Sequence, residues 1–142
     1  MQKKGVVSVF CVGLLLGGMT LAGEDSRQWV KLPEMMQHHM MSNMRDHLVA
    51  INEILANMSN GELDKAAEVA ESRLGMSSLD SHGAEHMAKF MPEGMRNAGT
   101  DMHQAASRFA LKAQEGDALP AYGLLVEVTS ACVACHAGYR IR

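Results

Sequence analysis

Apolar side chains recur every three or four residues along most of the chain after residue 33, and this period predicts helices. A first helix is expected from just after Pro33 to about Asn57, because proline is favoured in the first turn of a helix and Asn60-Gly61 follows as a turn. Seven apolar residues form its predicted core face: Met36, Met40, Met44, Leu48, Ile51, Leu55 and Met58.

The same reasoning predicts three more helices. The second is expected over residues 62–74, where Gly75 stops it, and the third over about residues 100–114. Between them, residues 76–99 are broken by serines, glycines and Pro92, which predicts a long connection with short helical pieces. The fourth is expected over about residues 120–136. Four helices with one long link favour an all-α fold, an antiparallel four-helix bundle.

Composition agrees with this fold class. The 142 residues include 13 methionines and 3 prolines, and 4% of them are aromatic. Met, Leu, Ala, Glu and Lys lose little rotamer freedom in a helix. A chain of this length has room for one domain with a sizeable core, which is expected over residues 23–142.

Residues 1–22 predict a secretory signal peptide. They begin with a basic head, continue with an apolar stretch shorter than the ~20 residues of a membrane span, and offer Thr20 and Ala22 as small residues for cleavage after Ala22. The alternative is an uncleaved membrane anchor. The pattern therefore favours an exported, periplasmic protein with no membrane span after signal cleavage.

Removal of residues 1–22, which hold two lysines and no acids, takes the formal net charge from −3 to −5. An acidic exported chain lacks the basic surface that nucleic acid requires, so no nucleic-acid partner is expected.

Cys132-Val133-Ala134-Cys135-His136 is the C-x-x-C-H pattern of c-type haem attachment. Two thiols three positions apart on a helical turn can each bond to one of two neighbouring vinyl groups at a haem edge. The histidine that follows can then bind the iron from the same side as a proximal axial ligand. The expected cofactor is one covalently attached haem c, held by Cys132, Cys135 and His136.

Other interpretations of these residues stay open. A thioredoxin-like redox pair begins a helix in an α/β fold, whereas this pair lies near the end of a helix in an all-helical chain. A structural zinc site needs further Cys or His ligands, and the histidines considered for it match no common spacing: His38, His39, His82 and His86. A methionine-rich copper site is a minor alternative, because thioether sulfur suits Cu(I); its ligands would come from residues 35–44, Met87, Met91 and Met95.

With the motif in its last helix, the chain resembles the class II c-type cytochromes, the cytochrome c prime family, which carry the motif in the fourth helix. Six residues follow His136, and Tyr139-Arg140 matches the family's aromatic and basic pair after the motif. The resemblance covers the layout of residues 23–142 and, in sequence detail, residues 132–140 and part of the first helix. It implies a haem-binding bundle that transfers single electrons to and from redox partner proteins.

The resemblance also concerns the second axial ligand of the iron. In high-spin members an apolar residue covers the iron, which stays five-coordinate and binds gases such as NO and CO; in low-spin members a first-helix methionine binds it. Met44-Arg45-Asp46 resembles the ligand-bearing segment of the low-spin branch, so Met44 is the expected distal ligand, with Met40 next. A bis-histidine haem through His47 and a five-coordinate gas-binding haem are the alternatives.

The remaining expectations concern the surroundings of the haem. Four arginines are candidates to pair with its propionates: Arg27, Arg45, Arg96 and Arg140. His82, His86 and His103 are expected at the surface or in loops. No spacing brings two carboxylates or a nucleophile and a base into one cleft, so the chain is not expected to be an enzyme. Family members pair through their first two helices, which implies a homodimer as an expected assembly.

Overall fold

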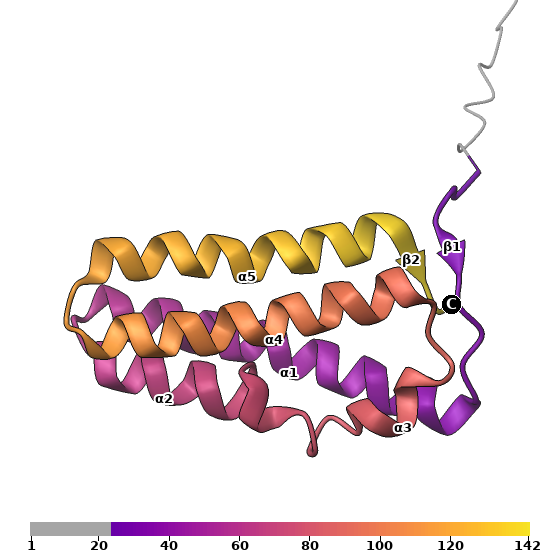
Figure 1. Ribbon diagram of the computed structural model, residues 1–142, viewed down its shortest axis with the longest axis horizontal. Coiled ribbons are helices and arrows are strands. Elements are labelled where there is room, and N and C mark those ends of the chain that lie inside the picture. Colours follow the sequence, from indigo (N-terminus) through magenta and orange to yellow (C-terminus); the bar gives the residue numbers. More distant parts are fainter. Residues whose placement is uncertain (1–23) are drawn as a thin grey trace, which may run out of the picture.

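The structure is a computed structural model that describes residues 24–142, and it is all-α (Figure 1). The predicted signal peptide, residues 1–22, lies outside the described residues. Four long helices and a short one make up most of the fold: α1 (Glu34–Ser59), α2 (Leu63–Arg73), α3 (Ala84–Ala88), α4 (Glu93–Gln114) and α5 (Ala118–Gly138). A 3₁₀ turn, η1 (Met76–Ser78), and two short strands, β1 (Gln28–Trp29) and β2 (Tyr139–Arg140), complete it.

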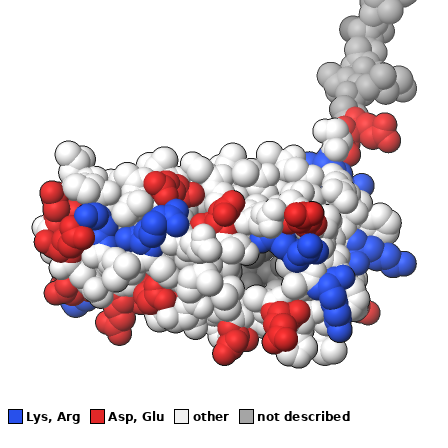
Figure 2. Space-filling view, in the orientation of Figure 1, with Lys and Arg blue, Asp and Glu red and all other residues white. Residues whose placement is uncertain are grey.

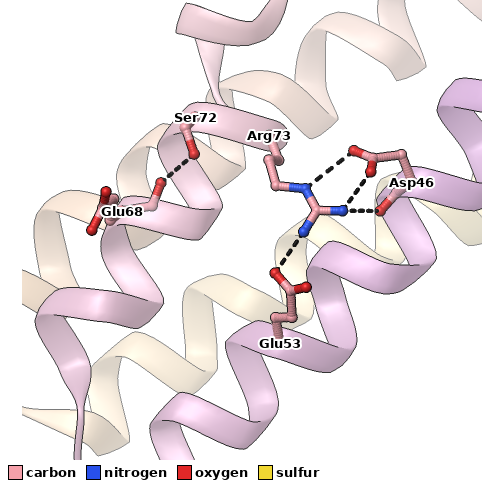
Figure 3. Close-up of polar contacts among 5 residues, drawn as sticks. All are labelled: Asp46, Glu53, Glu68, Ser72 and Arg73. Carbon is pink, nitrogen blue, oxygen red and sulfur yellow. Dashed lines mark hydrogen bonds and ion pairs between the residues drawn. The ribbon is translucent and has the colours of Figure 1, made fainter.

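The four long helices lie side by side, with α1 packed on α2, α2 on α4, and α4 on α5 (Figure 1). Three-residue links hold α1 to α2 and α4 to α5, and both contain a glycine with positive φ, Gly61 at 74° and Gly116 at 83°. Such a φ strains other residues, so glycine permits these tight reversals. An ion pair also fixes α2 on α1, because Arg73 contacts Asp46 and Glu53 (Figure 3).

The interior consists of two clusters. The alanine-rich core runs between α1, α2, α4 and α5, and Phe109, Ile54 and Leu74 are its largest fully buried side chains. Small residues there let the helix backbones approach closely. The methionine-rich core lies at the other end of the molecule and comprises Val30, Leu32, Met40, Met87 and Met95, with further half-buried residues packed on it.

The predicted face of α1 is partly wrong. Leu48 and Leu55, expected in the core, are 70% and 44% exposed, whereas His47, Ala50 and Ile54 are buried. The apolar period extends over two stripes of α1, and the stripe that faces the core includes a small residue and a polar one. The prediction was based on hydrophobicity alone and therefore assigned the stripe with the larger apolar side chains to the core.

The predicted start of the third helix is also wrong. Helix α4 begins at Glu93, seven residues before the expected Thr100, and it includes Gly94 and Gly99. In a prediction from local sequence alone, these two glycines indicate a loop rather than a helix. At Gly94 the reason for glycine is a close approach, because a Cβ there would overlap the hydroxyl of Tyr139.

The short strands were not predicted. Strand β1 pairs with β2 in parallel, with Gln28 opposite Tyr139 and Trp29 opposite Arg140, and the Val30 N–H donates to the Arg140 carbonyl at 2.8 Å. The pair, called the clasp below, closes the end of the molecule that holds the methionine-rich core (Figure 1).

Within residues 24–142, α5 is the one helix long and apolar enough by composition to cross a membrane. It packs against α4 and contributes Ala121, Leu125 and Val128 to the alanine-rich core, while Leu119, Val126 and Val133 are exposed. The length and composition of α5 therefore suit a helix packed within the fold as well as a membrane-spanning helix.

Candidate functional site

A cavity of about 690 Å³ opens at the end of the molecule that carries α3 and the clasp. Figure 2 shows a hollow on this side of the surface, between clusters of charged residues. Its volume lies within the ~300–1,000 Å³ range of small-molecule and cofactor sites. Residues from α1, the link between η1 and α3, α3, α4, α5 and the clasp line it, so the cavity is enclosed by segments far apart in the sequence.

The C-x-x-C-H motif lies on the last turns of α5, at the wall of this cavity. Cys135 and His136 line the cavity, with Cys135 half-buried and His136 exposed. Cys132, one turn earlier, packs on the alanine-rich core. Both thiols are free, and burial raises the pKa of each, the nearby Cys132 adding to the shift at Cys135.

Methionines form much of the opposite wall. Met40 is buried and Met44 half-buried on α1, and both line the cavity. Met44 and Cys135 pack on the same methionine-rich core. The structure thus places the predicted distal ligand on the same cavity as two residues of the predicted attachment motif. Further methionines line it from the connection and from α4: Met87, Met91, Met95 and Met102.

Arginines gather at the rim of the cavity. Three of the four arginines considered for propionate contacts line it, Arg27, Arg96 and Arg140, and Arg142 joins them. Arg45 does not belong to this lining within the described residues. The Arg140 Nε is buried without a hydrogen-bond partner among residues 24–142, although the Asp25 carboxylate lies 3.6 Å away. Arg27 and Arg140 both pair with Asp25, and an anionic group at this rim would meet a cluster of positive charges.

Three buried histidines meet on the inner wall. His47 from α1, His82 from the link before α3 and His103 from α4 are each 7–8% exposed, and all three line the cavity. Their ring centroids are 4.8 Å apart for His47–His82, 5.4 Å for His82–His103 and 6.2 Å for His47–His103. These residues are called the histidine triad below.

The prediction of surface or loop positions is wrong for His103, which is buried on α4. His82 lies in a loop as expected but is buried, and His86 is exposed as expected. His82 is held in place because its carbonyl accepts from Asn43 Nδ2 and His39 Nε2, each at 3.0 Å. For His103 a signal existed in the sequence, since it precedes the buried Ala106 and Ala110 by three and seven positions. A hydrophobicity pattern counts histidine as polar and therefore missed it.

Burial governs the charge of the histidine triad. Desolvation, followed by repulsion from His82 and His103, lowers the pKa of His47 from 6.5 to about 4, although Asp46 opposes the shift. Desolvation also lowers the pKa of His82 and of His103. All three imidazoles are thus neutral at neutral pH.

The residues considered for zinc are dispersed, since His38 and His86 are exposed whereas His82 is buried. Of the methionines considered for copper, Met35 is 80% exposed, whereas six line the cavity together: Met40, Met41, Met44, Met87, Met91 and Met95. Within residues 24–142 no group of three or more His, Cys, Asp or Glu side chains is already arranged to hold a metal ion.

Comparison of the chain with protein-family models, with curated proteins and with solved structures finds no match.

Proposed function

We propose that this protein is an exported mono-haem c-type cytochrome that carries single electrons, on an antiparallel four-helix bundle of the class II type. The observation that carries the proposal is the large methionine-lined cavity onto which Cys135 and His136 of a C-x-x-C-H motif face. A helix-borne motif with two free, half-buried thiols, of which Cys135 lines a cofactor-sized cavity and Cys132 lies one turn earlier, supports covalent haem attachment.

The residues present fit a haem in several respects. Cys132 and Cys135 would form the two thioether bonds, and His136 would be the proximal axial ligand. The apolar side chains of Met40, Met87 and Met95 would cover the macrocycle, while the rim arginines would pair with the propionates. Arg140, whose Nε has no hydrogen bond among residues 24–142 but lies 3.6 Å from the Asp25 carboxylate, carries a charge that such an anion would pair with.

Met44 is the proposed distal ligand. It is half-buried on the cavity wall, and it packs on the same core as Cys135. A thioether ligand opposite a histidine raises the reduction potential of a haem and leaves no vacant position for a substrate, which suits electron transfer rather than catalysis. Met40, fully buried one turn earlier, is the second candidate.

A gas-binding haem protein is the competing function, and one observation favours keeping it. His47 lies one turn after Met44, lines the cavity, and its Nε2 has no hydrogen-bond partner among residues 24–142. If no side chain binds the iron on the distal side, such a polar group stands ready to interact with a bound diatomic ligand.

The test is a visible absorption spectrum of the exported protein, oxidised and reduced, with and without carbon monoxide. Low-spin bands in both states, a weak far-red sulfur–iron band when oxidised, and no response to carbon monoxide are expected. Met44→Leu should abolish the far-red band, whereas Met35→Leu, at an exposed methionine of the same helix, should leave it unchanged.

Other spectra would change the proposal in stated ways. Low-spin bands without the sulfur feature would replace Met44 by His47, and a high-spin spectrum that responds to carbon monoxide would favour gas binding. Absence of haem bands in a host able to attach haem would refute the proposal. Cys132→Ser together with Cys135→Ser provides the matched haem-free control.

Partners follow from the proposed role. Redox proteins would approach the surface around the exposed His136. Pairing of two copies through α1 and α2 is proposed as well, because Leu48, Val49 and Leu55 leave an apolar stripe of α1 exposed to solvent.

A further inference from the structure

The proposed haem ligands do not explain why three histidines are buried together. Three imidazoles from three separate elements are each more than nine-tenths buried and face one another on the inner wall of the cavity. Buried histidines are ordinarily satisfied by hydrogen bonds, so the first question is where the ring nitrogens find partners.

Two of the rings have their tautomers fixed by neighbours. His103 Nδ1 lies 2.7 Å from the Leu74 carbonyl, which only accepts, so Nδ1 carries the proton. His82 Nδ1 lies 3.3 Å from Ser78 Oγ, whose own hydrogen is donated to the Gly75 carbonyl at 2.7 Å. His82 Nδ1 therefore donates as well, and both rings keep their Nε2 lone pair free.

The third ring adds an unsatisfied nitrogen. His47 Nε2 is buried and has no hydrogen-bond partner among residues 24–142. Buried nitrogens left without partners cost free energy, typically about 1–3 kcal/mol each. The rings of His82 and His103, 4.8 and 6.2 Å from the ring of His47, carry further acceptors, and a cation is the group that would satisfy several acceptors at once.

The spacing of the rings suits a single ion. Zinc–nitrogen bonds of about 2.0–2.1 Å in tetrahedral geometry place the centroids of the bound imidazoles about 5 Å apart. The observed separations are 4.8, 5.4 and 6.2 Å. The nitrogens do not converge in the described residues, which contain no ready metal site. Movement of the His47 ring, whose Nε2 has no hydrogen-bond partner among residues 24–142, would therefore accompany binding.

The surroundings match those of metal-binding histidines. Such ligands commonly donate their second ring nitrogen to a carbonyl or hydroxyl, which fixes the tautomer and the ring orientation, and Leu74 and Ser78 serve His103 and His82 in this way. The link that carries His82 is clamped to α1 through Asn43 and His39.

The triad is also displaced from the attachment motif. Gly94 of α4 lies against Tyr139, and α4 and α5 run antiparallel. His103 lies nine residues beyond Gly94, about 13 Å along the helix, whereas Cys135 lies four residues before Tyr139, about 6 Å. Measured along the helix axes from the contact between Gly94 and Tyr139, His103 of the triad thus lies about 7 Å farther away than Cys135.

We propose that His47, His82 and His103 bind one divalent transition-metal ion of the Zn²⁺ class at the inner wall of the cavity. Imidazole suits Zn²⁺ and Cu²⁺ among the borderline ions. The site is separate from the haem ligands and does not depend on the identity of the distal ligand unless that ligand is His47.

The first experiment measures zinc bound by the exported full-length protein. The protein is stripped with a chelator, equilibrated with ZnCl₂, desalted, and analysed for zinc and iron, with affinity taken from calorimetry. One zinc per chain is expected. His82→Gln and His103→Gln should each weaken binding at least tenfold, whereas His38→Gln and His86→Gln, at exposed positions, should not.

A second measurement guards against misfolded variants. Long-range ¹H–¹⁵N spectra of the reduced wild-type protein report imidazole nitrogens directly, and zinc should shift the Nε2 signals of the triad alone. The proposal is overturned by lack of stoichiometric zinc, by equal loss in the exposed-histidine variants, or by unmoved triad signals. A changed haem spectrum in His47→Gln, without zinc binding by the wild type, would also overturn it and assign His47 to the iron.

Discussion

Met44 and His47 lie one turn apart on α1 and both line the cavity, although one is a thioether and the other a polar base. The resemblance of a short segment identified Met44 as a candidate ligand. The burial of His47, and its meeting with His82 and His103, could not be predicted in the same way. Contacts between residues 47, 82 and 103 depend on how three segments pack, and a local pattern holds no information on that.

The pH dependence of stability should follow from His47. Its folded-state pKa of about 4 lies below the unfolded value of 6.5, so the unfolded chain binds the extra proton first as the pH falls. In chelator-treated protein the free energy of unfolding should be constant above about pH 6.5 and decrease by ~3 kcal/mol towards pH 4 from this residue alone. Urea unfolding at a series of pH values measures this.

Other titratable and charged groups near His47 also affect how the free energy of unfolding depends on pH. His82 and His103 should add to the loss, since their pKa values are also lowered, while the charges of Asp46 and Arg73 partly oppose each other. The variant His47→Gln should show a shallower decrease between pH 6.5 and 5, where carboxylates contribute little. A wild-type stability that stays flat over that interval would contradict the buried, neutral state of the triad.

Gly94 offers a second prediction at the residue scale. Gly94→Ala should lower the free energy of unfolding by about 1 kcal/mol, because the new methyl group displaces the Tyr139 hydroxyl. Gly123→Ala is the matched control, since no atom of the described residues lies within 4 Å of the new Cβ, and it should raise stability by ~0.5–1 kcal/mol. Equal gains in both variants would show that Tyr139 does not approach α4.

Among the elements, helices with a clean apolar period were the most predictable. The bounds of α2 and the end of α4 agree with expectation to within a residue. Helix α1 was found, but its core face was misassigned because Ala50 and His47 carry little hydrophobic signal. The start of α4 was missed because Gly94 and Gly99 resemble a loop when their packing is unknown.

The corrected face of α1 is testable by two substitutions. Ile54→Ala removes a fully buried side chain from the alanine-rich core and should lower the free energy of unfolding by about 2–5 kcal/mol. Leu48→Gln alters a residue that is 70% exposed and should change the stability of the monomer by no more than about 0.5 kcal/mol. Chemical denaturation at low protein concentration compares them, and the reverse order would restore the original assignment.

At the scale of the whole molecule, the fold class was predictable and the cavity was not. Helical period and composition predict an all-α chain, and the motif predicts where a cofactor would attach. Part of the cavity wall comes from the connection and the clasp, where residues such as His82 and Arg140 have no periodic signal. The place of Arg140 depends on pairing between β1 and β2, which are about a hundred residues apart in the chain, and that of His82 depends on contacts of its carbonyl with α1.

The apolar stripe of α1 predicts self-association. Sedimentation equilibrium of the wild-type protein should show dimers, and Leu48→Gln should shift the population towards monomer by placing a polar amide in the paired surface. Leu119→Gln, at an exposed leucine of α5, is the control and should leave the association unchanged. A monomeric wild type, or equal effects of both variants, would contradict pairing through α1.

The clasp has a consequence for the order of events during folding. Val30 and Arg140 lie near opposite ends of the described chain, so the hydrogen bond between them closes a very long loop. Closing such a loop costs conformational entropy, and we therefore expect this bond to form only after the helices have assembled. During synthesis β1 cannot pair with β2 until residues 139 and 140 have been added to the chain. The mouth of the cavity is therefore the last part to close, which gives a bulky group a period of open access before the two ends join.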